Sequence, residues 1–107
     1  MELNKKKRAE IEEQPLRLAF PLSYQHLIDQ FAQYHLHSYD VKASVIAQVD
    51  GFLVLLRYGE GLSQSQQQVF EENELIQVCE ELTQFYDEVA HLCKKTLIAD
   101  YYKMIKP

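Results

Sequence analysis

Two runs of β-forming residues with an Asp50-Gly51 pair between them constrain the fold of this chain more than any other feature. The first run, 41–49, alternates Val and Ala with other residues, and the second, 52–58, is almost wholly apolar. An Asp-Gly pair between such runs is typical of a two-residue type I′ turn, because both turn positions need positive φ. The pattern therefore predicts a β-hairpin with Asp50 and Gly51 at its tip.

The predicted turn fixes which residues face each other across the hairpin. Val49 then pairs with Phe52, and Val45 with Leu56, because the register is counted outward from the turn. The residues on this face are all apolar: Ala43, Val45, Ala47, Val49, Phe52, Val54, Leu56 and Tyr58. We expect this face to pack against the helices of the domain.

The opposite face of the hairpin carries three large apolar residues, Ile46, Leu53 and Leu55. A solvated sheet face is normally polar, so something should cover these side chains. In one alternative the segment 15–20, in which apolar residues alternate, folds back over them as an extended segment or a fourth strand. In the other alternative they form a patch that binds a partner or a second copy of the chain.

Helical periodicity lies on both sides of the hairpin. Apolar residues recur at helical spacing over 22–36, with Ser23 as the N-cap or Pro21 as the first helical residue. Residues 73–105 carry a longer apolar stripe that neither Gly nor Pro interrupts. The glutamine-rich segment 62–70 is predicted as a third strand, with a loop as the alternative. This order indicates an α+β fold: an antiparallel meander of three or four strands, with one short and one long helix packed on one face.

Length and charge indicate a single domain behind a charged leader. The chain has 107 residues, enough for one core. In residues 1–14 four bases are balanced by four acids, and this leader is predicted to be flexible. Residues 15–107 are predicted to form the single α+β domain. The longest apolar run, 52–56, is too short to cross a bilayer, and no signal peptide is recognised, so we expect a cytoplasmic protein without membrane contact.

The two cysteines, Cys79 and Cys93, fit a reducing compartment. On one continuous helix they would lie about 21 Å apart along the axis, at 1.5 Å per residue. A disulfide needs Cα atoms within about 7 Å, so no intrachain bridge is expected. Their separation is close to four helical turns, which predicts that both are buried on the same face. Neither has the spacing of a metal ligand, and no metal or cofactor is expected.

The second predicted helix is longer than the body of the domain. A straight helix over 73–105 would span about 50 Å, whereas a compact domain of this size is about 30–35 Å across. The helix therefore overhangs the body, or it breaks near 94–96 and folds back. If it overhangs, its last turns expose residues that are expected to bind a protein partner or a second copy: Leu97, Ile98, Tyr101, Tyr102 and Ile105.

Charge disfavours nucleic acid as a direct partner. The net charge is −5, and residues 71–88 hold seven acids and no Lys or Arg. This run is interpreted as a solvated helix face or, in the sharper alternative, as a docking surface for a basic partner. The residues of that docking surface are Glu74, Glu80, Glu81, Asp87 and Glu88.

No catalytic motif is recognised in the sequence. It contains no glycine-rich phosphate loop, no G-x-S-x-G elbow and no H-E-x-x-H zinc motif, which makes an enzyme the least favoured hypothesis. The preferred hypothesis is a non-catalytic protein-interaction or regulatory domain that self-associates, with a homodimer expected. The alternative is a small-ligand-binding domain, with an apolar pocket between sheet and long helix lined by Tyr58, Phe85 and Tyr86.

Overall fold

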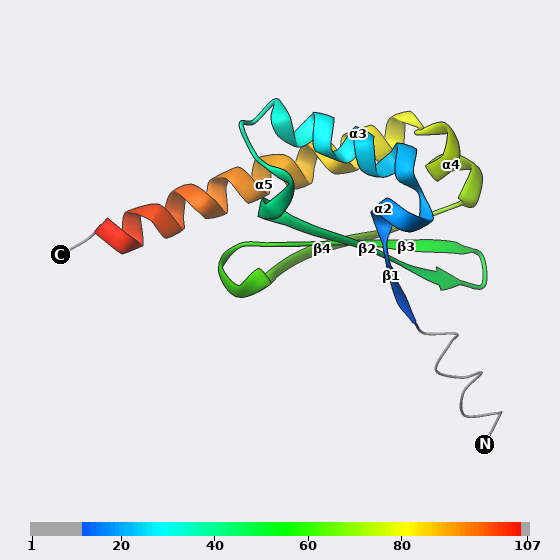
Figure 1. The fold of residues 1–107 in the computed structure, drawn as a ribbon, viewed down its shortest axis with the longest axis horizontal. Coiled ribbons are helices and arrows are strands. Elements are labelled where there is room, and N and C mark those ends of the chain that lie inside the picture. The colour runs from blue at the N-terminus through cyan, green and yellow to red at the C-terminus, as the bar shows by residue number, and fades with distance from the viewer. Residues whose placement is uncertain (1–11, 106–107) are drawn as a thin grey trace, which may run out of the picture.

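The computed structural model describes residues 12–105, which form one four-stranded antiparallel sheet with helices on one of its faces (Figure 1). The strands follow one another in the sheet in chain order: β1 (Glu13–Pro15), β2 (Val41–Gln48), β3 (Gly51–Tyr58) and β4 (Gln64–Phe70). The α-helices are α2 (Leu16–Ala19), α3 (Pro21–Ala32), α4 (Glu72–Gln77) and α5 (Glu80–Ile105). Short 3-10 turns lie at Ser38–Asp40 (η1) and Glu60–Leu62 (η2). The predicted α+β meander is confirmed, with 64–70 as a strand.

The core lies between the sheet and the pair of long helices. α3 and α5 lie side by side over the sheet, and their buried residues meet those of β2 and β3 (Figure 1). α3 begins at Pro21, one of the two predicted starts, but it ends at Ala32 and not near residue 36. The turn that follows has a positive φ of 62° at His35, which brings Leu36 back into the core.

The hairpin forms in the predicted region, but its turn lies one residue earlier in the chain. The turn residues are Val49 and Asp50, so Val45 faces Val54 instead of Leu56. Neither turn residue has a positive φ, so the predicted type I′ turn is wrong. Because the pairing shifts by two residues, the side chains of both strands keep their predicted faces. Val49, which the prediction placed on the packed face, is fully exposed in the turn.

Gly51 is required by packing between strands and not by the turn. It is the first residue of β3 and has a φ of 157°. A Cβ at this position would lie 2.6 Å from the backbone oxygen of Phe70 in β4. Glycine here allows close approach of another backbone, a role it often has inside strands.

The alternating segment 15–20 is not extended, contrary to the prediction. After Pro15 the chain forms the single helical turn of α2, which begins at Leu16 and is followed by its C-cap Phe20, four residues later. Both residues are buried. Leu18, between them, is exposed. A helical period therefore accounts for the apolar residues of this segment, which packs on the helix side of the sheet and does not cover the opposite face.

The fourth strand comes from the predicted leader instead. β1 pairs antiparallel with residues Ser44–Ile46 of β2 and forms one edge of the sheet. Glu13 and Gln14 therefore belong to the folded domain and not to a leader that ends at residue 14. The rest of that leader, residues 1–11, lies outside the described residues.

The helical region after β4 breaks once, at a place that the sequence does not signal. Val78 adopts a left-handed conformation, with φ 55° and ψ 66°, and ends α4. The amides of Val78 and Cys79 both donate to the carbonyl oxygen of Glu74. The break lets α4 bury Leu75 in the core. A β-branched residue rarely adopts this conformation, which is why a straight helix from residue 73 is predicted and is wrong.

The break also separates the environments of the two cysteines. Cys93 is fully buried in α5, as predicted, whereas Cys79 lies in the turn before α5 and is half-buried. The prediction that both lie on one helix face is therefore wrong. Both thiols are free.

Candidate protein-interaction surfaces

α5 extends past the end of the sheet as one continuous helix (Figure 1). Its 26 residues correspond to about 39 Å at 1.5 Å per residue. The molecule is accordingly elongated, with extents of 55 × 34 × 18 Å. Of the two predicted alternatives, an overhanging helix and a break near 94–96, the structure has the overhang.

We use the name tail surface for the apolar side chains Leu97, Ile98, Tyr101 and Tyr102 of α5. Ile98, Tyr101 and Tyr102 have exposed fractions of 47%, 59% and 62%, whereas Leu97 is half-buried against the core. The two tyrosine rings contact each other edge to face, with their centroids 5.8 Å apart. Ile105 belongs to the last turn of α5, and its side chain lies outside the described part. Four of the five predicted partner-binding residues of this helix are therefore brought together.

A groove of about 340 Å³ separates the tail surface from the loop that follows α3. His35 and Leu36 line it from the loop and Asp40 lines it from η1. Beneath it, the Cys93 thiol donates to the backbone oxygen of Asp40 at 3.8 Å, which joins the loop to α5. Burial, with a smaller effect of Asp40, raises the pKa of the Cys93 thiol to about 11, so the thiol is protonated at neutral pH.

Ile46, Leu53 and Leu55 lie together on the outer face of the sheet, the face turned away from the helices. Leu53 pairs with Ile46 on one side and with Val69 on the other. Leu55 is buried, Ile46 and Leu53 are half-buried, and Val69 is exposed. This second predicted surface is therefore contiguous, but less of its apolar area is accessible than on the tail surface.

An ion pair closes one side of the outer face. The Arg57 guanidinium donates to both carboxylate oxygens of Glu13, at 2.6 and 3.2 Å. The hydrogen bond from Arg57, and then one from Ser44, lower the pKa of Glu13 from 4.5 to about 2. Glu13 and Arg57 are 44 residues apart in the chain, and the pair depends on a strand that the sequence pattern does not predict.

The predicted acidic docking residues of α5 lie in two rows. Glu80 and Asp87 are seven residues apart, as are Glu81 and Glu88, so each pair lies on a similar side of the helix, two turns apart. Within the described residues no Lys or Arg occurs on α5 before Lys94. The acidic half of α5 is therefore followed by a half that carries its basic residues.

Two of the five predicted docking acids have local structural roles. Glu74 accepts a hydrogen bond from the backbone amide of Glu71 at 2.8 Å and so caps α4. Asp87 accepts a hydrogen bond from the Tyr34 hydroxyl at 2.9 Å, which raises the pKa of that phenol. Each of these two carboxylates therefore already accepts a hydrogen bond from a group of its own domain.

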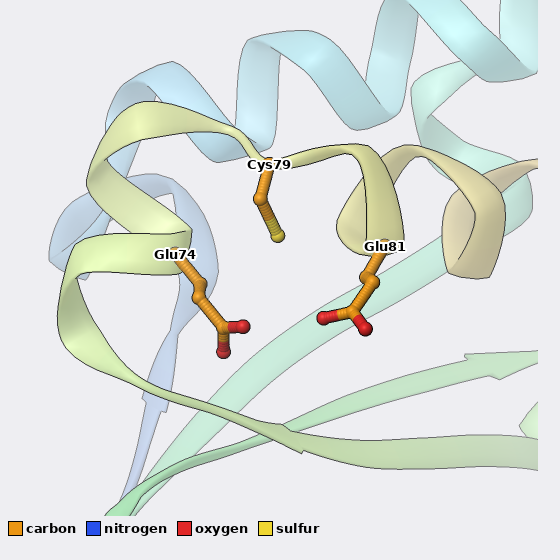
Figure 2. Close-up of side chains that lie close together, drawn as sticks. All are labelled: Glu74, Cys79 and Glu81. Carbon is orange, nitrogen blue, oxygen red and sulfur yellow. The ribbon is translucent and has the colours of Figure 1, made fainter.

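Figure 2 shows, at the break between α4 and α5, a cluster of side chains of the kinds that bind metal ions. The carboxylates of Glu74 and Glu81 and the thiol of Cys79 lie within 4.8 Å of one another. Helix capping accounts for Glu74, and the favourable interaction of an acid with a helix N-terminus accounts for Glu81. The sequence gives no sign of this cluster, because the left-handed residue between the two helices creates it.

Tyr58, Phe85 and Tyr86 pack in the core and line none of the grooves described above. A ligand pocket lined by these three residues stays a prediction. The rings of Phe85 and Tyr86 have centroids 6.1 Å apart. Burial raises the pKa of the Tyr86 phenol, and its hydroxyl has no hydrogen-bond partner among residues 12–105. The neighbouring Ser23 hydroxyl, which partly opposes that rise, donates to the backbone oxygen of Leu75.

No protein-family model, curated protein or solved structure matches this chain. Across residues 12–105, no helix combines the length and the apolar character needed to span a membrane. Function is therefore inferred from the geometry of the surfaces described above.

Proposed function

We propose that this chain is a non-catalytic, cytoplasmic protein-interaction domain that self-associates through the tail surface. The supporting observation is that Ile98, Tyr101 and Tyr102 are about half exposed or more on a helix that has left the sheet. Interface cores are enriched in aromatic residues, and burying a side chain of this size contributes roughly 1.5–3 kcal/mol. The free thiols of Cys79 and Cys93 fit a reducing cytoplasm.

The charge pattern of α5 favours a second copy as the partner. Its first half carries four acids and no Lys or Arg, whereas its second half carries Lys94, Lys95 and Lys103 against the single acid Asp100. Two such helices packed antiparallel would place the basic half of each beside the acidic half of the other. This arrangement is self-complementary, as a two-fold dimer requires.

The outer sheet face is the weaker candidate for the same role. Leu55 is already buried, and Ile46 and Leu53 are half-buried, so a partner would remove less apolar area from water there. The ion pair at one side of this face also keeps a charged rim next to the apolar residues. We therefore assign self-association to the tail surface.

The test is the solution mass of the full chain, measured by light scattering over a range of concentrations. We expect a dimer for the native sequence and a monomer for the double variant Ile98→Lys, Tyr102→Lys. Both side chains are exposed in the single chain, so the variant should still fold and should lose only the stability that dimerisation adds. Leu18→Lys is the matched control, because it charges an equally exposed apolar residue on α2 and should leave the dimer intact. A native chain that stays monomeric at high concentration would overturn the proposal.

A further inference from the structure

A second groove, of about 610 Å³, lies where β1 ends beside β2. Its walls come from β1, α2, α3, β2 and β3, and include Glu13, Arg17, Tyr24, Lys42 and Arg57. We infer that this groove binds an extended acidic segment of a partner protein, which adds to the sheet as a strand beside β2. The inference does not depend on self-association through the tail surface.

The unpaired edge of β2 indicates an extended occupant. β1 pairs only with Ser44–Ile46, because the chain turns into α2 after Pro15. Val41, Lys42 and Ala43 therefore have partners in β3 but none in β1. The backbone N–H and C=O groups of such an edge form hydrogen bonds with an added strand. Residues 41–43 thus form an edge of β2 that no strand of residues 12–105 pairs with, next to the end of β1.

The charge of the groove indicates an acidic occupant. Arg17, Lys42 and Arg57 converge on it against one acid, Glu13, although the chain as a whole has a net charge of −5. Arg57 is paired with Glu13, whereas Arg17 and Lys42 have no salt bridge to any acid of residues 12–105. Two cations without an ion-pair partner among residues 12–105 favour acidic side chains over basic ones.

β1 already shows how this region holds an acidic strand. Glu13 is in an extended conformation beside β2, and its carboxylate accepts hydrogen bonds from Arg57. Lys42 adds a smaller electrostatic attraction. A segment that continued along β2 where β1 stops would bring its own acid to Lys42.

The alternation of β2 defines the side chains that the segment needs. Lys42 points to the outer face, where its cross-strand neighbour is Arg57. Ala43 points to the helix side, where Tyr24 also lines the groove. Residues of the added strand that face outward should therefore be acidic, and those that face the helices should be apolar. A sequence in which acidic and apolar residues alternate fits this groove.

The experiment measures fluorescence anisotropy with the full chain and a short labelled peptide of alternating Glu and Val. We expect saturable binding that weakens with added salt, and binding at least about tenfold weaker for a peptide in which Lys replaces each Glu. Lys42→Glu and Arg17→Glu should each weaken binding of the Glu peptide by about tenfold or more. Lys95→Glu is the matched control, because it makes the same charge change on α5, outside the groove, and should leave the affinity unchanged.

Hydrogen exchange then locates the added strand, with new protection expected at those amides of residues 41–43 that point away from β3. Equal binding of the Glu and Lys peptides, or an equal effect of Lys95→Glu and Lys42→Glu, would overturn the inference. Displacement of the peptide by inorganic phosphate at equal concentration would indicate a small-anion site and would also overturn it. So would loss of self-association in Lys42→Glu, since a second copy would then occupy the groove. The double variant Ile98→Lys, Tyr102→Lys should still bind the peptide, which separates this test from that of the proposed function.

Discussion

Gly51 at the start of β3 lies directly against the backbone oxygen of Phe70 at the end of β4, where a Cβ would be 2.6 Å away. We expect Gly51→Ala to lower the free energy of unfolding by about 1–3 kcal/mol, because the strands must separate and the backbone conformation is strained for an L residue. Urea denaturation measures this loss. Gly61→Ala is the control: its φ is also positive, at 64°, but no atom lies within 4 Å of the added Cβ. An equal loss in both variants would show that close approach to β4 is unimportant.

The same contact shows where prediction from sequence stops. The meander, the start of α3 and the apolar outer face follow from periodicities within single segments, and the structure contains them. The hairpin turn lies one residue before the Asp-Gly pair, and Gly51 instead lies against Phe70, a residue of another strand that no local pattern brings to it. The ion pair of Glu13 with Arg57 and the break at Val78 likewise arise from packing between distant segments. The groove of about 610 Å³ beside β2 is lined in part by β1, a strand that the sequence pattern does not predict. Sequence patterns alone therefore do not indicate this groove.

The thiols of Cys79 and Cys93 should react at very different rates. Cys93 is fully buried, and the pKa of its thiol is raised to about 11, whereas Cys79 is half-buried in a turn. We expect one thiol per chain to react with a disulfide reagent in native buffer, and the second only after denaturant is added, because the thiolate is the nucleophile. Cys79→Ser should remove the fast reaction, and Cys93→Ser should leave it. Fast labelling of both thiols in the native protein would contradict the burial of Cys93.

The ion pair of Glu13 should give a pH-dependent contribution to stability. The pKa of Glu13 falls from 4.5 to about 2 on folding, so its contribution is fully present above pH 4.5 and is lost as pH falls toward 2. Since both side chains are about 30% exposed, solvent screening limits this contribution to about 1 kcal/mol or less. The difference in unfolding free energy between the native chain and Glu13→Gln should therefore shrink as pH is lowered from 6 to 3. A difference that stays constant over this range would contradict a pH-dependent contribution of the ion pair. Glu12→Gln, at the exposed neighbouring position, serves as the control.

The Tyr86 hydroxyl tests whether a buried polar group without a hydrogen-bond partner lowers the stability of the domain. It is buried and has no hydrogen-bond partner in the described range. Leaving such a group without a partner costs about 1–3 kcal/mol, so Tyr86→Phe should leave stability unchanged or raise it by up to about 1 kcal/mol. Tyr34→Phe is the control, because that hydroxyl donates to Asp87 and its removal should lower stability slightly. A loss above about 1 kcal/mol in Tyr86→Phe would mean that the hydroxyl has a partner, such as a bound water.

The overhang of α5 predicts that its last turns contribute to association and little to folding. Truncation after Leu97 keeps the half-buried residue that packs against the core, and removes Ile98, Tyr101 and Tyr102, which are about half exposed or more. We expect the shortened chain to unfold at a urea concentration close to that of the monomeric Ile98→Lys, Tyr102→Lys chain, with a difference of less than about 1 kcal/mol, since little apolar area leaves the interior. In light scattering at the same concentration, its mass should fall from that of a dimer to that of a monomer. If the truncated chain is instead several kcal/mol less stable than the monomeric full-length Ile98→Lys, Tyr102→Lys chain, the last turns fold against their own domain, and the tail surface is not free to bind a second copy.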